Sequence, residues 1–408
     1  MPVLHAHTVE IDDPGPLAPY LPQTSGTAWL RRGDGMIGIG EVTRWQGREI
    51  AAGEAWWQEF LAEVSVTTLD QVPASGPIAF GTFCFDPDNT DARATMIVPE
   101  LIIGRRNGRC WLTRIGEDPR QVPTLPEPAR GSAPRQVSWS DGSLNGPAWE
   151  AMVAGAVESI RTGAVDKVVL ARDVIAHADA ALDHRLLVER LSSEYERCWT
   201  WSIDGLVGAT PEMLIRREGG MATSRVLAGT IRRTGHDDHD LALAAALSQS
   251  SKDLAEHEFA VASVAEKLAP YCSGMHVPDS PYVLELPNVL HLATDVTGVT
   301  TDHASSLALA GALHPSAAVC GTPTDAARDL IAEIEHLDRG RYSGPVGWLD
   351  AHGDGEWGIA LRCGQILSED PSSIRLFAGC GIVADSDPAA ELAESNAKLV
   401  PMRDALGG

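Results

Sequence analysis

SGPVGWLDAHGDGEWGIALRCGQI, residues 343–366, contains two apolar runs separated by the glycine-rich turn AHGDG. A third apolar run, SIRLFAGCGIV at 373–383, follows a short polar segment. Strands that are joined by so short a turn form a hairpin, and the strands of a hairpin are antiparallel. This pattern excludes a doubly wound parallel sheet. We therefore expect an α+β fold with large antiparallel sheets and flanking helices.

Patterns of helix and strand alternate on the N-terminal side of this stretch. Apolar residues at helical spacing predict helices at 52–64, 146–162, 183–195, 238–250, 253–268, 305–313 and 324–334, and buried-strand patterns occur at 165–178 and 288–297. Residues before about 135 consist mainly of short strand patterns broken by Gly and Pro. The proline-rich segment VPTLPEPARGSAPR, residues 122–135, predicts a connector. We expect it to separate a β-rich N-terminal portion, 1–135, from a catalytic portion, 136–408.

Composition restricts the class of function. The chain has 408 residues and a net charge of −24, so it lacks the basic surface that nucleic-acid binding requires. It contains seven cysteines without CxxC spacing, which indicates reduced thiols in the cytoplasm. No apolar window is long enough to span a membrane, and the N-terminus does not resemble a signal peptide. We expect a cytoplasmic protein with no nucleic-acid or membrane partner.

The segment GCGIVADSDPAAELAESNAK, residues 379–398, combines a glycine-rich turn with a predicted helix. Glu391, Glu394 and Lys398 are three and four residues apart, so they share one helical face. Asp253 and Glu256 are also three apart, near the start of another predicted helix. Carboxylates from two helices could hold Mg²⁺, which prefers oxygen ligands. Each acidic pair taken alone could equally be a solvated helix start that the helix dipole stabilises.

Two titratable residues occupy positions that suit acid and base catalysis. Lys167 precedes the apolar run Val168–Leu170, where partial burial would favour a neutral amine that can act as a base. Glu212, in GATPEML, lies among apolar residues, where burial would raise its pKa and make it a general acid. The alternatives are a lysine exposed at a strand end and a glutamate in a turn or at a sheet edge.

Three further residues indicate recognition of an anion. Gly229, between Ala228 and Thr230, predicts a strand position with accessible backbone amides. Arg362 offers a planar fork that matches a carboxylate, and Tyr342 offers a hydroxyl group. A structural salt bridge is the competing interpretation of Arg362.

Several motifs together are similar to those of the chorismate-utilising enzymes, and to the isochorismate synthases among them. The similarity covers about residue 146 to the C-terminus, and the N-terminal third is less similar. They occur in the order KVVLAR (167–172), GATPEML (208–214), LAGT (227–230), KDLAEH (252–257), HLATDVTG (291–298), LHPSAAVCGTP (313–323), DRGRYSGPVGW (338–348), LRCGQI (361–366) and GCGIVADSDPAAELAE (379–394).

This resemblance implies two large antiparallel sheets packed together with helices outside, and a site in the C-terminal portion. It implies that Lys167 activates water for attack at C2 of chorismate and that Glu212 protonates the departing C4 hydroxyl. It implies Mg²⁺ on Glu256 and Glu394, with Asp253 and Glu391 in support. Family members often have Glu at the position of Asp253. The implied substrate-binding residues are Ala228, Gly229, Thr230, His291, Ala318, Tyr342, Arg362, Gly379, Gly381 and Lys398.

Two positions distinguish reactions within the family. Lys167 resembles the lysine found in family members that use water rather than ammonia as the nucleophile. We therefore expect that no glutamine amidotransferase subunit is required, and we expect a monomer. Ala318 occupies a position where salicylate synthases tend to have Thr, and it therefore favours release of isochorismate. Salicylate synthase and a non-catalytic chorismate-binding subunit are the alternatives.

Overall fold

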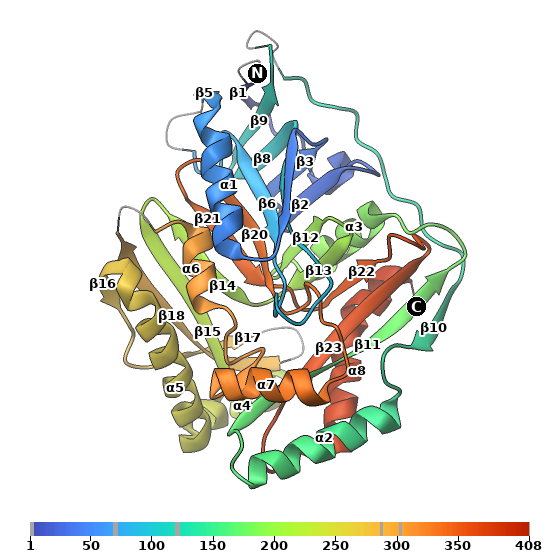
Figure 1. Ribbon diagram of the computed structural model, residues 1–408, viewed down its shortest axis with the longest axis vertical. Coiled ribbons are helices and arrows are strands. Elements are labelled where there is room, and N and C mark those ends of the chain that lie inside the picture. Colours follow the sequence, from blue (N-terminus) through green and yellow to red (C-terminus); the bar gives the residue numbers. More distant parts are fainter. Residues whose placement is uncertain (1–3, 68–71, 119–122, 286–288, 302–303, 408) are drawn as a thin grey trace.

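The computed structural model describes residues 4–67, 72–118, 123–285, 289–301 and 304–407 (Figure 1), except for the side chains of Thr230, Lys252, Asp253 and Glu256. Within these ranges, two large sheets rich in antiparallel pairs are flanked by helices. The predicted α+β class is thereby confirmed.

The larger sheet has 13 strands among the described residues, and it contains strands from both ends of the chain. Twelve of them follow the order β10-β11-β23-β22-β13-β12-β2-β3-β8-β9-β1-β5, and the short β19 pairs with β11. Their bounds are β1 Leu4–Ile11, β2 Gly26–Arg31, β3 Asp34–Ile39, β5 Val64–Thr67, β8 Leu101–Arg106, β9 Arg109–Gly116, β10 Val137–Asp141, β11 Lys167–Ala178, β12 Trp199–Ile203, β13 Leu206–Thr210, β19 Gly321–Thr322, β22 Cys363–Ile366 and β23 Ser373–Ile382.

The second sheet has 10 strands in the described part of the chain. Its order is β16-β18-β15-β14-β21-β20-β6-β7-β4, and β17 pairs with β18. The bounds are β4 Thr43–Gly47, β6 Ile78–Thr82, β7 Ala94–Val98, β14 Met213–Glu218, β15 Met221–Arg232, β16 Cys272–His276, β17 Tyr282–Glu285, β18 Val289–Thr300, β20 Pro345–Asp350 and β21 Gly355–Ile359.

The hairpin predicted from AHGDG is present between β20 and β21. Its strands are antiparallel, with Pro345 opposite Ile359 and Leu349 opposite Gly355. Asp350 Oδ1 accepts hydrogen bonds from the backbone amides of His352 (2.8 Å) and Asp354 (3.0 Å), as short polar side chains commonly do in turns. Gly353 adopts φ +77°, a conformation that favours glycine.

The predicted helices are all present, with ends shifted by one or two residues. The bounds are α1 Ile50–Ala62, α2 Gly146–Arg161, α3 His184–Glu194, α4 Asp237–Gln249, α5 Ser251–Leu268, α6 Ser306–Leu313, α7 Thr324–Ile334 and α8 Pro388–Leu406, with 3₁₀ turns η1 Ala18–Tyr20 and η2 Ala269–Tyr271. Four described helices, α2, α3, α6 and α8, begin at a side-chain cap; for example, Asn145 accepts from the Ala148 amide, and Asp387 from the Ala390 amide.

Residues before and after the connector share both sheets. Residues 123–135 of the connector have no regular structure, as predicted. β2 pairs with β12, and β6 pairs with β20, so each sheet continues from one portion into the other. A single hydrophobic cluster contains Trp57 and Phe80 from the first portion and Trp357 from the second, each with 0% exposure. The predicted boundary near residue 135 stays a prediction.

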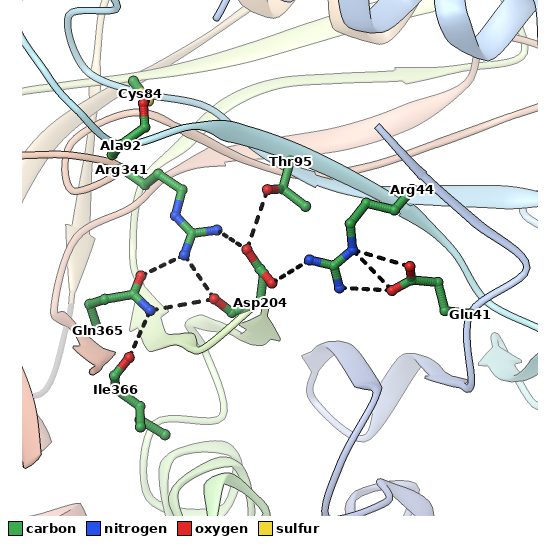
Figure 2. A network of polar contacts seen from close by, with 9 residues as sticks. All are labelled: Glu41, Arg44, Cys84, Ala92, Thr95, Asp204, Arg341, Gln365 and Ile366. Atoms are coloured by element: carbon green, nitrogen blue, oxygen red, sulfur yellow. Dashed lines mark hydrogen bonds and ion pairs between the residues drawn. The ribbon is translucent and has the colours of Figure 1, made fainter. Parts of the chain in front are cut away.

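A polar network adds to this connection (Figure 2). Asp204, in the turn between β12 and β13, accepts hydrogen bonds from Arg44 (2.8 Å) and Arg341 (2.9 Å). Arg44 also pairs with Glu41, and Arg341 donates to Gln365 at 2.7 Å. The network therefore fastens the N-terminal segment around Arg44 to the turn that precedes Tyr342.

All seven cysteines are unpaired, and no described helix is long and apolar enough to cross a membrane.

Candidate active site

A cavity of about 980 Å³ lies between strands of the two sheets and helices α5 and α8. It gathers residues that are up to 231 positions apart, from Lys167 to Lys398. The residues singled out from the sequence that line it are Lys167, Glu212, Ala228, Gly229, His291, Ala318, Tyr342, Arg362, Gly379, Gly381, Glu394 and Lys398.

The remaining predicted site residues fall into two groups. Glu391 does not line the cavity, but it lies beside Glu394 and Cys380. The side chains of Thr230, Asp253 and Glu256 lie outside the described residues. Their predicted roles in binding substrate and metal therefore stay predictions.

Lys167 is the first residue of β11, and the alternation of side chains along the strand directs Val169 and Ala171 to the same cavity face. Gly381 lies opposite Val169 on the neighbouring β23. A methyl group added at Gly381 would lie 2.9 Å from Lys167 Cε. The missing side chain at Gly381 thus makes room for the lysine in the cavity.

Glu212 lies in the short link between β13 and β14, where its backbone carbonyl accepts from the Ile359 amide at 3.1 Å. Burial raises the pKa of its carboxyl group to about 7, although the nearby Lys167, Lys398 and Arg362 cations oppose the shift. Glu212 is half-buried and lines the cavity, which argues against the alternative of a turn residue in open solvent. It can therefore hold a proton near neutral pH.

Helix α8 presents two carboxylates and an amine beside the glycine-rich strand β23. Lys398 Nζ donates to Glu394 Oε1 at 2.7 Å and to the Gly379 carbonyl at 2.9 Å. Burial would raise the pKa of Glu394, but the Lys398 ammonium outweighs it and the pKa lies below its usual value. Burial raises the pKa of Glu391, which accepts from the Ser386 hydroxyl at 2.8 Å. Glu394 is therefore the more readily ionised of the two.

A group of possible metal ligands lies on this side of the cavity. One donor atom from each of Cys380, Glu391 and Glu394 falls within 4.8 Å of the others. Cys380 is buried, and burial raises the pKa of its thiol to about 12. The thiol donates to the Glu391 carbonyl at 3.3 Å. The carboxylate oxygens are thus the available donors, and they suit a hard cation.

Arg362, Tyr342 and His291 form a part of the wall that can recognise an anion. Among the side chains that the structure describes, no carboxylate lies within salt-bridge distance of Arg362, so the structural salt bridge is not supported. Tyr342 stacks on Phe377 with ring centroids 5.0 Å apart, which fixes the direction of its hydroxyl. Burial, followed by the Arg362 and Lys398 cations, lowers the pKa of His291 to about 4. His291 is therefore neutral at pH 7.

The predicted strand position at Gly229 is a bulge. Gly229 has φ +78°, and the pairing of β15 with β18 shifts register between Ala228 and Thr230. Next to it, His257 Nδ1 donates to the Ala228 carbonyl at 3.1 Å and Nε2 accepts from the Thr294 hydroxyl at 2.7 Å. His257 on α5 thereby ties this helix to both strands at the cavity.

Several cavity residues were not predicted from the sequence. They include the basic residues Arg232, Lys267 and Arg339, and the aromatic Phe377. For Arg339 the only local signal is weak, because Glu335 precedes it by four residues but both lie beyond the end of the helix predicted at 324–334. Arg232 and Phe377 follow from long-range strand pairing and have no such local signal.

Residues 29–407 match the family model described as chorismate binding enzyme. The chain belongs to this family. It is 33% identical to isochorismate synthase MenF of Bacillus subtilis, over 83% of this chain and 76% of the relative. It is 34% identical to the salicylate biosynthesis isochorismate synthase of Pseudomonas aeruginosa, over 99% of this chain and 90% of that one.

A solved structure of a family member has the same fold. The menaquinone-specific isochorismate synthase MenF from Escherichia coli matches with a TM-score of 0.82 over 100% of this chain and 95% of its own. The two sequences are 24% identical, and their likeness shows a common fold.

Proposed function

We propose that this chorismate-binding enzyme is a magnesium-dependent isochorismate synthase, an isomerase that converts chorismate to isochorismate. The observation that carries the proposal is the presence of Lys167 and Glu212 on the walls of one cavity, beside Glu394 and Lys398. Relatives named isochorismate synthase, with 33 and 34% identity over most of the chain, support the same activity. We further propose that the protein acts as a monomer without a glutamine amidotransferase subunit.

In the proposed reaction, Lys167 acts as the base and takes a proton from water as the water oxygen bonds to C2 of the ring. The two ring double bonds shift, the C4–O bond breaks, and protonated Glu212 gives its proton to the departing hydroxyl. One water enters and one leaves, so the product is an isomer. Solvent must then return the proton from Lys167 to Glu212 before the next turnover.

The residues around Glu394 fit Mg²⁺. Glu394 supplies an oxygen donor at the cavity and Glu391 supplies one beside it, and we propose that Asp253 and Glu256 complete the set. When bound, Mg²⁺ would supply positive charge that neutralises the ring carboxylate of chorismate. Arg362 and Tyr342 would bind the enolpyruvyl carboxylate, because a half-buried guanidinium that lines the cavity without a carboxylate partner in the described structure suits an anionic ligand.

Product analysis tests this function. The purified protein would be incubated with chorismate in the presence of Mg²⁺ or EDTA, and isochorismate, salicylate and pyruvate would be separated by chromatography. We expect isochorismate without pyruvate, and only with Mg²⁺. Formation of salicylate and pyruvate would mean that Ala318 does not prevent the elimination. Absence of any product would favour a non-catalytic chorismate-binding subunit.

Glu212 should give the reaction a basic limit. Because a general acid must be protonated, and the pKa of Glu212 is about 7, kcat should be lost as the pH rises through this value. We expect a decrease of about tenfold per pH unit above the pKa, and kcat measured from pH 6 to 9 checks it. Glu212→Gln, which cannot donate this proton, should be nearly inactive. Glu356→Gln is the control, because the Glu356 carboxylate accepts a hydrogen bond from Trp29 and has no proposed role in the reaction. This variant should keep the wild-type pH profile of kcat.

Gly381→Ala should test the placement of Lys167. The added methyl would come within 2.9 Å of Lys167 Cε and displace the amine, while the backbone at residue 381 remains in a conformation that alanine tolerates. We expect kcat for chorismate to fall by about 10- to 100-fold with little change in Tm. Gly155→Ala on α2 is the matched control, since a methyl there meets no atom within 4 Å. Equal kcat for the two variants would contradict the proposed position of the base.

A further inference from the structure

One edge of β11 has an interruption next to the cavity. On this edge β11 pairs with β19 at Lys167 and Val168, and with β10 from Val174 to Ala178. Between these partners, residues 169–173 face no strand on this side among the described residues. Backbone groups in the middle of a strand must still find hydrogen-bond partners.

Side chains supply partners for both backbone groups of Ala171 and for the Val169 carbonyl. The Ala171 amide donates to Glu335 Oε2 at 2.8 Å, and the Ala171 carbonyl accepts from Trp149 Nε1 at 3.0 Å. The Val169 carbonyl accepts from Arg339 Nη2 at 2.7 Å. The Glu335 carboxylate thus takes the place of a backbone carbonyl on a neighbouring strand, and the Arg339 guanidinium takes the place of a backbone amide. Both groups bind β11 at residues that line the cavity.

Glu335 and Arg339 are themselves a buried ion pair. Arg339 Nε and Nη2 each lie 2.6 Å from a carboxylate oxygen of Glu335. Arg339 is 4% exposed and Glu335 is 1% exposed. The Arg339 guanidinium also lies 4.2 Å from the centre of the Phe85 ring. Planar bidentate pairing and stacking fix its orientation more strongly than a single contact could.

Arg339 also connects β11 to a second wall of the cavity. Its Nη1 donates to the Val319 carbonyl at 2.9 Å, and the Val169 amide donates to the Cys320 carbonyl at 2.8 Å. Ala318, the cavity residue proposed to influence the product, immediately precedes Val319. One guanidinium therefore sets the distance between the strand that begins with Lys167 and the segment that contains Ala318.

We propose that the Glu335–Arg339 pair is a positioning device for catalysis, which holds Lys167 and the Ser316–Cys320 segment in register around the substrate. This role rests on the proposed isochorismate synthase function. A buried ion pair is in general a weak source of stability, so its network of bonds to cavity-lining backbone indicates a geometric purpose. Displacements of about 1 Å in an active site can reduce the rate about 100-fold.

Arg339→Lys tests the proposal because lysine keeps the positive charge opposite Glu335 but lacks the planar fork. Arg185→Lys is the matched control: Arg185 forms a bidentate pair with buried Asp183, at 2.9 and 2.7 Å, on α3 and outside the cavity lining. If Arg339→Lys does not fold, Glu335→Leu combined with Arg339→Met removes the same bonds without leaving a charge unpaired.

The measurements are kcat and KM for chorismate with Mg²⁺, and hydrogen exchange of peptides spanning 167–173 and 316–320. For Arg339→Lys we expect kcat to fall about 100-fold with KM changed less than about threefold, and faster exchange in both peptides. Arg185→Lys should change neither quantity. A similar kcat loss in both variants, or wild-type kcat in Arg339→Lys, would overturn the proposal.

Hydrogen exchange separates this inference from the proposed function. If the wild-type protein did not convert chorismate, the isochorismate synthase assignment would fail, and exchange would still report on the pair. Unchanged exchange at 167–173 and 316–320 in Arg339→Lys would then overturn the positioning role. Faster exchange confined to these peptides would support it.

Discussion

Lys167→Ala is expected to reduce kcat for chorismate by at least about 1,000-fold, because the variant lacks the amine that takes the proton from the attacking water. The fold should persist, since residue 167 is the first of β11 and its side chain faces the cavity. Substrate affinity should change little, because Arg362, Tyr342 and Mg²⁺ are proposed to bind the two carboxylates. Steady-state kinetics, Tm and titration with chorismate under non-turnover conditions provide the measurements.

Lys267→Ala is the control for this experiment. Lys267 also lines the cavity, but its amine donates to the Pro315 carbonyl at 3.3 Å, and we propose no proton transfer for it. Its replacement should leave kcat within about tenfold of wild type. If Lys167→Ala retained kcat near the wild-type value, or if Lys267→Ala were the more damaged variant, Lys167 would not be the base.

Glu394→Gln is expected to have the second large effect, on the response to Mg²⁺. The glutamine amide has no negative charge. In the wild-type protein Lys398 Nζ lies 2.7 Å from Glu394 Oε1, so the substitution also removes the carboxylate that neutralises Lys398, and the ammonium would repel a cation. We expect half-maximal activity to require about 100-fold more Mg²⁺, with kcat reduced even at saturation. Activity measured across a Mg²⁺ titration, and calorimetric titration of Mg²⁺ in the absence of turnover, check this.

Two other acids on α8 serve for comparison with Glu394. Asp404→Asn removes an exposed carboxylate from the same helix and should leave the Mg²⁺ titration unchanged. Glu391→Gln should weaken the Mg²⁺ response less than Glu394→Gln, because Glu391 has a raised pKa and accepts a hydrogen bond from Ser386. An unaltered titration for Glu394→Gln would remove this residue from the metal site.

The hairpin at 343–366 shows why much of this fold could be predicted from the sequence. Its turn residues and apolar runs are local signals, and the structure has the antiparallel pair that they require. The helices from α2 to α7 were predicted for the same reason, from apolar periodicity within single segments. The residues of the cavity could be predicted only from the order of the family motifs. Local patterns alone could not distinguish a functional Lys167 or Glu212 from an exposed one.

Other features depend on contacts between distant segments and could not be predicted. The pairing of β2 with β12 and of β6 with β20 extends both sheets into the N-terminal portion, and no period or spacing in the sequence indicates these partners. The same holds for Glu335, whose carboxylate replaces a missing strand at Ala171, 164 residues away. Local periodicity reports which face of an element is buried, but not which neighbour covers it.

The run from β23 through α8 places constraints on how this enzyme can evolve. Gly379, Glu394 and Lys398 meet through contacts fixed by one strand end and one helix. Each residue added to an α-helix rotates everything beyond it by about 100°, so a single insertion between Glu391 and Lys398 would send the amine to another face. A single substitution in this segment changes one side chain, whereas an insertion or deletion separates Glu394 from Lys398 or Gly379. Lineages should therefore diverge here in residue identity and keep the residue count.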